Sequence, residues 1–218
     1  LHYYKSRGDR KYVKLFRDTA FISKLRETPW DVPYEEFETK VLSGFLNSIG
    51  LRLPIGKRGG NILAEIIKLR HCTSSLQGIH LLNCDFSDEN LLQNIQQIYN
   101  GLSSVDGLWV TGISKIAHTL NESLFVVLDL KISKHFGLRG QADDYIKWLG
   151  IAQQGALEVT GDFQALGLPG SPAAFLSEKL GHSNYGCQKS LARFIDEYFW
   201  LTISENLPVP PNWEPSLL

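Results

Sequence analysis

The chain has 218 residues, of which 43% are hydrophobic and 21% are charged, and its formal net charge is −1. These values are ordinary for a folded protein and argue against general disorder. They also argue against a protein that holds nucleic acid mainly through a large positive total charge, although a local basic patch is compatible with them. This length accommodates one large domain or two small lobes that share a core.

The cellular location is inferred from what the sequence lacks. No hydrophobic run approaches the length of about 18 to 20 residues that a membrane-spanning helix needs. The first residues lack the apolar centre of a secretory signal peptide, and the 3 cysteines do not provide an extracellular disulfide framework. We therefore expect a cytoplasmic protein without a membrane partner.

The first part of the chain predicts helices. Residues 1–30 mix charged and aromatic side chains in the pattern of a helix with one partly buried face. A second helix is expected to begin at Asp31, and its hydrophobic residues recur every four positions from Phe37 to Ile49. Gly50 stands where a glycine commonly follows the end of a helix.

Residues 53–60 predict a flexible, basic loop that leads into another helix. Lys57 and Arg58 precede two glycines at the expected N-terminus of that helix, where a phosphate could bind. The spacing differs from that of a nucleotide-binding P-loop, in which the second glycine is followed directly by Lys and then by Ser or Thr. An ordinary solvated loop is the alternative.

The next helix is expected to begin at Asp88 and to carry one hydrophobic stripe from Leu91 to Leu102, with Gly101 and the Ser103–Gly107 stretch breaking it. Later helices are expected at residues 142–148, 172–180 and 188–203. The chain then continues as an extended, proline-rich tail at 207–218. Residues 150–170 hold several glycines and predict a looser segment. Because no alternating strand pattern occurs, we predict an all-α fold.

Residues 108–129 are the most informative stretch. Thr111-Gly112-Ile113-Ser114 predicts a tight turn into a short helix, which Asn121 and Glu122 interrupt. A hydrophobic run, residues 124–128, then leads to a carboxylate, Asp129, at the expected start of another helix.

This order of a helix, a glycine turn, a second helix and an Asp opening the next helix resembles the helix-hairpin-helix DNA glycosylase superfamily. The resemblance extends over residues 88–136 and implies a helical, two-lobed protein that acts on or binds damaged or unusual bases in DNA. Gly112 would match a hairpin glycine, Asp129 the catalytic carboxylate, and Lys131 a basic position usually filled by His.

The resemblance implies monofunctional hydrolysis of an N-glycosidic bond without a cofactor. Gly112, Ser114 and Lys115 would approach the DNA backbone, and the loop at Lys57 and Arg58 would be a secondary phosphate contact. One hairpin glycine is present where two are expected, and Lys115 is out of register with the lysine that makes some relatives lyases. We therefore expect no lyase step.

Non-catalytic alternatives exist for each part of this interpretation. An Asp at a helix start is a common N-cap, worth about 1 kcal/mol, so Asp129 needs no catalytic role. A helix-hairpin-helix module that binds DNA or protein without catalysis is the alternative function. His71, Cys72, His80 and Cys84 are metal-ligand types, but their spacing is not that of a structural zinc site, and we expect no metal.

Overall fold

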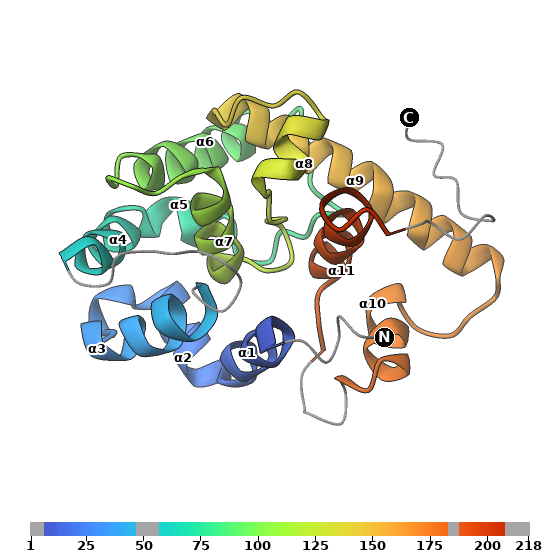
Figure 1. Cartoon of the computed structure of the whole chain (residues 1–218), viewed down its shortest axis with the longest axis horizontal. Helices are drawn as coiled ribbons and strands as arrows, with labels where there is room; N and C mark the ends of the chain where they lie inside the picture. Colours follow the sequence, from blue (N-terminus) through green and yellow to red (C-terminus); the bar gives the residue numbers. More distant parts are fainter. Residues whose placement is uncertain (1–6, 47–56, 183–187, 208–218) are drawn as a thin grey trace.

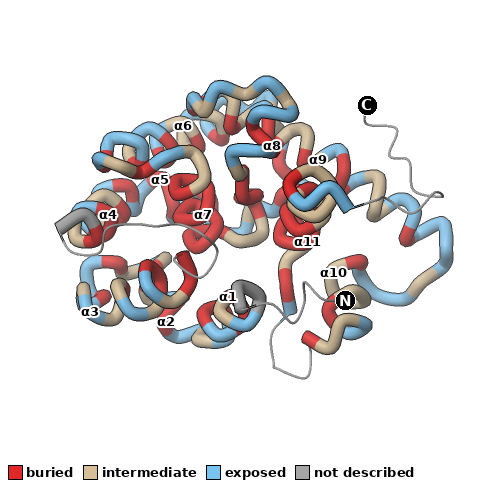
Figure 2. The backbone as a smooth tube through the Cα atoms, viewed as in Figure 1, coloured by how far each residue is buried: buried red, intermediate tan, exposed pale blue. Residues whose placement is uncertain are grey.

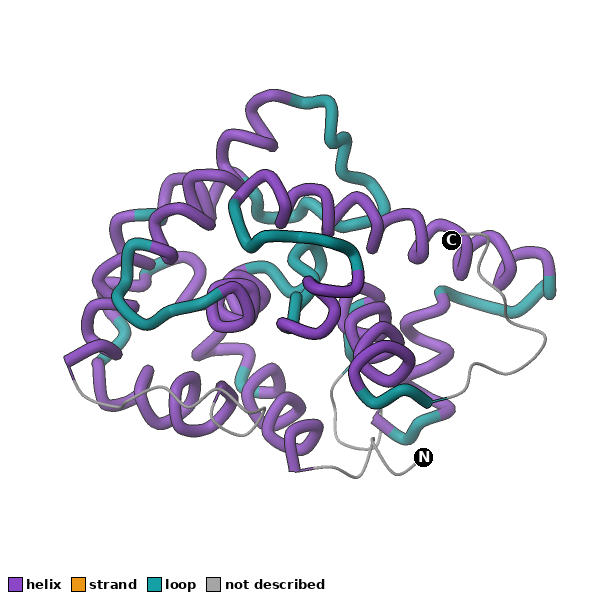
Figure 3. Tube along the Cα trace, turned by 45° about the horizontal axis from the view of Figure 1, so that its top comes forward, coloured by secondary structure: helices purple, strands orange, loops and turns teal. Residues whose placement is uncertain are grey.

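The structure is a computed structural model that describes residues 7–46, 57–182 and 188–207. Within these ranges the regular elements are helices and no strand occurs, which confirms the predicted all-α fold (Figure 3). One hydrophobic cluster connects the first helix to the last, from Tyr12 to Phe199. The expected tail at 207–218 lies outside the described residues except for Leu207, and the division into two lobes stays a prediction.

The elements of the first half are α1 (Arg7–Arg17), α2 (Thr19–Glu27), η2 (Pro29–Asp31), α3 (Tyr34–Phe37), the π-helix η3 (Glu38–Leu46), α4 (Lys57–Lys68), α5 (Arg70–Ser75) and α6 (Glu89–Ser103). Those of the second half are α7 (Val110–Leu120), α8 (Leu130–His135), α9 (Ala142–Ala165), α10 (Pro172–Lys179), α11 (Leu191–Phe199) and the π-helix η6 (Trp200–Ser204). Figure 1 shows α7 between α3, α4 and α5 on one side and α8, α9 and α11 on the other, with α1 below it.

The central helix, α7, is buried on all sides. Every residue from Gly112 to Leu120 is buried, which is typical of a helix that crosses a core rather than lying on it. It packs against α6 on one side and α2 on another, and Figure 2 shows the continuous burial. Because α7 is enclosed, the polar side chains along it must find partners inside the protein.

The run after α7, residues 124–128, is also fully buried, although it is extended and has no strand beside it. Side chains satisfy its main-chain groups instead. The Ser114 Oγ accepts from the amide of Leu128 at 3.0 Å, and the Tyr145 hydroxyl donates to the carbonyl of Val126 at 3.0 Å. Because buried amides and carbonyls are costly without partners, these contacts hold the run beside α7 and lead it to α8.

The tight turn lies earlier than the sequence indicated. Thr111, Gly112 and Ser114 belong to α7 itself, and the connection between α6 and α7 turns at Gly107 instead, whose φ is +77°. Only glycine adopts that conformation readily. The predicted turn was wrong because the β-branched and small residues at 110–114 are held helical by burial, which outweighs their modest helix propensity.

Two glycine-based predictions were also wrong. Residues 57–60 form the first turn of α4 rather than a loop, and α6 continues through Gly101 to Ser103. Both glycines allow close packing instead: a methyl group on Gly59 would lie 2.6 Å from the Leu42 side chain, and one on Gly101 would lie 2.9 Å from the Leu69 side chain. Glycine at these positions lets neighbouring helices approach.

The long helix α9 replaces the predicted loose segment at 150–170. Its buried residues recur at helical spacing from Tyr145 through Leu149, Ala152 and Ala156 to Phe163. Each helical glycine costs about 1 kcal/mol relative to Ala, but burial of a continuous stripe exceeds that cost. The predicted start of the helix was correct, and its end was misplaced by the glycines.

Candidate functional site

Asp129 is the N-cap of α8, and both of its carboxylate oxygens are engaged. Oδ1 accepts a hydrogen bond from the amide of Ile132 at 2.7 Å, and Oδ2 accepts one from the hydroxyl of Ser204 at 2.6 Å. The side chain is therefore fixed by its own helix and by the C-terminal element η6. Asp129 is partly exposed, so a third partner from outside can still approach it.

Ser204 joins η6 to α8 by a second contact. The Nζ of Lys131 donates to the main-chain carbonyl of Ser204 at 2.6 Å. Lys131, the position that the resemblance assigns to a basic residue near the catalytic carboxylate, is thus anchored in the same place as Asp129. Its ammonium group lies against η6 and keeps one positive charge beside the start of α8.

Ser114 and Lys115 lie inside the protein, not at its surface. Ser114 is 0% exposed and bonds to both main-chain groups of Leu128, and Lys115 is 6% exposed. Neither side chain can reach a DNA backbone from these positions. The predicted roles followed from a turn at 111–114; because this segment is helical and buried, the side chains point into the core.

Lys115 is one basic group of a buried charge cluster that lies beside the partly exposed Asp129. Burial lowers the pKa of Lys115 to about 8, and the carboxylates of Asp196 and Asp129 act in the opposite direction. The positive charge of Arg193 lowers the pKa further. These interactions place an amine with reduced basicity among two carboxylates and a guanidinium.

The last helix, α11, supplies most of this cluster. Arg193, Asp196 and Glu197 are 3%, 4% and 1% exposed, and Arg193 forms ion pairs with both acids. The Nζ of Lys189, just before α11, lies 2.8 Å from Oε1 of Glu197. Burial raises the pKa of Asp196 to about 6, although Arg193 opposes this shift.

A histidine and a tyrosine close the cluster on the side of α1. His118 is 0% exposed, its Nδ1 lies 2.6 Å from the carbonyl of Phe125, and its Nε2 has no hydrogen-bond partner among the described residues. Burial lowers the pKa of His118 to about 3. The ring of Tyr12 lies 5.8 Å from that of His118 and 5.0 Å from the Arg193 guanidinium.

The remaining predicted residues lie elsewhere. Lys57 begins α4, and the side chains of Lys57 and Arg58 lie outside the described residues. Among the residues that the structure describes, no group of three or more His, Cys, Asp or Glu side chains could hold a metal ion. Cys84, one of the metal-ligand types, instead donates its thiol to the carbonyl of Leu81 at 3.1 Å.

The described residues also form a groove of about 270 Å³ between α6 and the start of α9, and Asp129 does not line it. The lining residues are polar except for Ala142, and the others are Gln96, Asn100, Gln141 and Asp143. The groove is therefore separate from the charge cluster.

The charges of α11 could not be located from the sequence. Arg193 and Glu197 have the spacing of an ordinary i,i+4 ion pair, which by itself does not distinguish an exposed pair from a buried one. The available signal was weak: hydrophobic residues surround these charges on every side of the helix, including Ala192, Phe194, Ile195 and Phe199. A helix of this kind is buried all round, and its charges must then neutralise one another.

Comparison with protein-family models, curated proteins and solved structures found no match for this chain. No helix in the described part of the chain combines the length and the hydrophobicity needed to cross a membrane. The candidate site is consequently defined by the geometry around Asp129 alone.

Proposed function

We propose that this protein hydrolyses the N-glycosidic bond of a damaged or unusual base in DNA, with Asp129 as the catalytic carboxylate, and that it acts in the cytoplasm. The observation that carries the proposal is the position of Asp129: a partly exposed carboxylate, held by two hydrogen bonds at the start of a helix, beside a buried lysine.

The order of elements supports the proposal. The α6–turn–α7 pair precedes an extended segment, and Asp129 follows that segment at the N-terminus of α8. This is the arrangement that the resemblance to helix-hairpin-helix DNA glycosylases implies. Trp109, the N-cap of α7, provides no side-chain cap, and the next two residues, Val110 and Thr111, are partly exposed, so a DNA phosphate would contact their amides. Gly112 is buried and is not part of this contact.

Asp129 would act on the sugar rather than on the base. As the N-glycosidic bond breaks, positive charge develops on the sugar, and a fixed carboxylate can stabilise it or orient the attacking water. Ser204 and the Ile132 amide hold the two carboxylate oxygens before substrate arrives, which reduces the cost of orienting them in the reaction. The target nucleotide must first leave the base stack to reach this carboxylate.

A second candidate is a helical module that binds DNA or protein without catalysis. It is favoured by the same two hydrogen bonds, because a carboxylate that caps α8 and holds η6 has a complete structural role. The two candidates differ in one property: only the enzyme requires the negative charge of Asp129, since a neutral Asn also caps a helix.

The proposal is tested with DNA duplexes that each carry one damaged or mismatched base. Wild-type protein is expected to release one of these bases, and Asp129→Asn is expected to slow the release by about 100-fold or more. The matched control is Asp88→Asn, which makes the same change at the N-cap of α6. Full activity of Asp129→Asn would remove the catalytic role, and DNA binding by the wild type without release of any base would favour the module.

A further inference from the structure

We infer that Trp109, Leu130, Lys134 and Arg139 form one surface, here called the Trp109 surface, that binds DNA at an unpaired nucleotide, with the Trp109 ring stacked on the exposed base. This inference rests on the proposed function, because it names the form of DNA that the protein recognises. It assigns the contact to side chains that neither the hairpin pattern nor the catalytic proposal includes.

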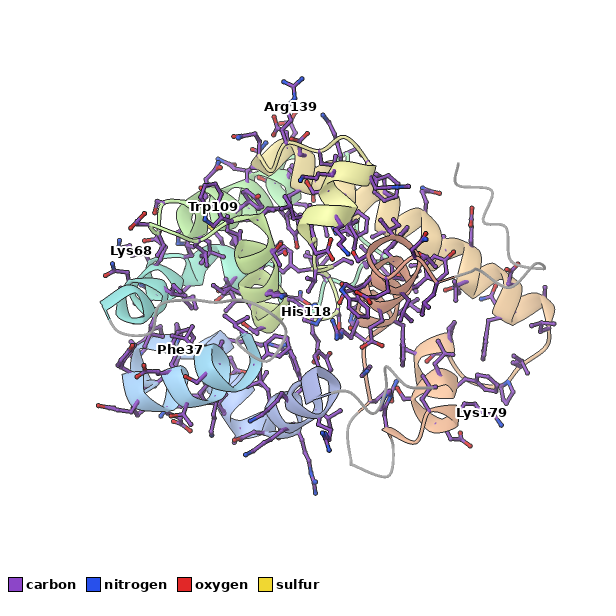
Figure 4. All side chains as sticks on the ribbon, in the orientation of Figure 1. Phe37, Lys68, Trp109, His118, Arg139 and Lys179 are labelled. Carbon is purple, nitrogen blue, oxygen red and sulfur yellow. The ribbon has the colours of Figure 1, made fainter. Side chains whose placement is uncertain are left out.

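The starts of α7 and α8 are joined side by side, which brings these residues to one region. The amide of Leu128, just before α8, donates to Ser114 in α7 at 3.0 Å. The turn after α8 also contacts the start of α7: a methyl group on Gly140 would lie 3.6 Å from Cβ of Val110. Trp109 directly precedes Val110, and Arg139 directly precedes Gly140. In Figure 4 both lie above His118, with Arg139 projecting from the upper edge.

Trp109 is the most exposed large hydrophobic residue of the described chain. Its exposed fraction is 79%, and that of Leu130 is 57%. A single exposed hydrophobic residue is normal on a protein surface and carries no inference. Here, however, the exposed Trp is the N-cap of α7 and the exposed Leu is the first residue of α8, directly after the candidate catalytic carboxylate.

The same region carries two basic side chains that form no ion pair with the described residues. Lys134 and Arg139 are exposed, and within the described residues their side chains form no ion pair. The acids that follow are already engaged: Asp144 accepts from the amide of Arg139 at 2.8 Å and pairs with Lys147 at 3.4 Å. A locally basic surface therefore exists on a chain whose formal net charge is −1.

An exposed aromatic ring beside unpaired basic side chains matches the chemistry of a nucleic-acid strand. Lysine and arginine neutralise phosphates, and aromatic rings stack on bases of any sequence. A base in a regular duplex is covered by its neighbours, so stacking needs a nucleotide without a partner. An acidic protein would satisfy the charges but gives no reason for an exposed Trp between them.

The ring is tested by binding, with the Asp129→Asn protein used so that no turnover occurs. Fluorescent duplexes with one bulged nucleotide, and fully paired duplexes of the same sequence, are titrated and read by anisotropy. Trp109→Ala is expected to weaken binding to the bulged duplex by about fivefold or more, and Trp109→Phe to restore much of it. Trp30→Ala is the matched control, because Trp30 is 52% exposed on a different element, η2.

The charges are tested by salt dependence. Removing two phosphate contacts with Lys134→Gln/Arg139→Gln is expected to reduce the slope of log K against log salt by about 1.4 to 1.8. The control is Lys14→Gln/Arg17→Gln, which removes two exposed basic side chains from α1. Two results would overturn the inference. One is that Trp109→Ala binds the bulged duplex as tightly as the protein that retains Trp109. The other is that the slope of log K against log salt is unchanged in Lys134→Gln/Arg139→Gln.

The outcome separates this inference from the proposed function. If the protein binds the bulged duplex through Trp109 but releases no base, the surface stands and the enzymatic proposal fails. If it releases a base while the Trp109 and Lys134/Arg139 variants bind as tightly as the parent protein, the surface fails alone. Absence of DNA binding at low salt, together with capture of an acidic polypeptide by this face, would also overturn the inference.

Discussion

Asp129 combines two roles that one carboxylate can hold at the same time. Its Oδ1 closes the first turn of α8, and its Oδ2 receives the Ser204 hydroxyl from η6. A carboxylate also has remaining lone pairs that can accept a further partner. The local pattern predicted the cap and the position of this residue at the helix start. It could not predict Ser204, which lies 75 residues further along the chain.

His118 makes a prediction about stability at low pH. Its pKa falls to about 3 in the folded protein because the ring is buried, whereas an unfolded histidine titrates near 6.5. The contribution of the neutral, buried His118 ring to the stability of the fold is therefore complete above about pH 6.5, and it is lost as the pH falls toward 3. Between these values His118 should contribute a decrease of up to about 1.4 kcal/mol per pH unit in the free energy of unfolding.

The measurement is urea unfolding from pH 7 to 5 for the wild type and for His118→Gln, whose amide can still donate to the carbonyl of Phe125. Asp196 titrates with the opposite sign, because its pKa is raised to about 6, so the difference between the two proteins is the informative quantity. The exposed residue His80, changed to Gln, is the control. Parallel pH profiles of wild type and His118→Gln would contradict the buried neutral state.

At the scale of elements, the glycines show why helix boundaries were misjudged. A glycine lowers helix propensity wherever it occurs, so the sequence alone predicted breaks at residues 57–60, 101 and 150–170. The structure keeps helices through residues 57–60, 101 and 150–165, because contacts between distant elements decide the outcome. Positions of N-caps were predicted better: Asp88 and Ser171 start helices as expected, since capping depends on local residues.

Two adjacent glycines in α4 make a matched prediction. Gly59→Ala would place a methyl group 2.6 Å from the Leu42 side chain and 2.7 Å from the Tyr34 hydroxyl, whereas nothing lies within 4 Å of the equivalent position on Gly60. We expect Gly59→Ala to lower the free energy of unfolding by about 1–3 kcal/mol. Gly60→Ala should leave it unchanged or raise it by up to about 1 kcal/mol. Urea denaturation of both variants tests this, and equal midpoints would show that α4 does not pack this closely.

At the scale of the whole molecule, α11 carries its charges into the centre and thereby connects the last element to the first. Lys189 and Arg193 both pair with Glu197, and both lie over the ring of Tyr12 in α1. A sequence pattern predicts which residues of a helix can pair with each other. It does not predict whether solvent or protein surrounds the pair, because that depends on how distant helices assemble.

Glu197→Gln tests the contribution of this buried cluster to stability. The change removes a carboxylate that pairs with both Lys189 and Arg193, leaving their charges less compensated in the core. We expect a loss of about 3–5 kcal/mol in the free energy of unfolding. Glu178→Gln, at an exposed position of α10, should change it by less than about 0.5 kcal/mol. A thermal or urea midpoint for Glu197→Gln equal to that of Glu178→Gln would contradict a buried, stabilising cluster.

Asp129 is a fixed, partly exposed carboxylate that joins the start of α8 to η6. The all-α class followed from hydrophobic spacing alone, and the location of Asp129 at a helix start followed from the residues around it. The charge cluster behind it did not, because it is assembled from α7, α11 and the start of α8. The function of the protein consequently depends on whether the Asp129 carboxylate takes part in the reaction.

The single-turnover rate of base release by Asp129→Asn, relative to Asp88→Asn under the same conditions, tests that claim most directly. Both variants exchange an N-cap carboxylate for an amide that still caps its helix, so folding should be preserved in each. The account predicts a rate at least about 100-fold lower for Asp129→Asn and an unchanged rate for Asp88→Asn. Equal rates for the two variants would show that Asp129 caps α8 and does nothing more.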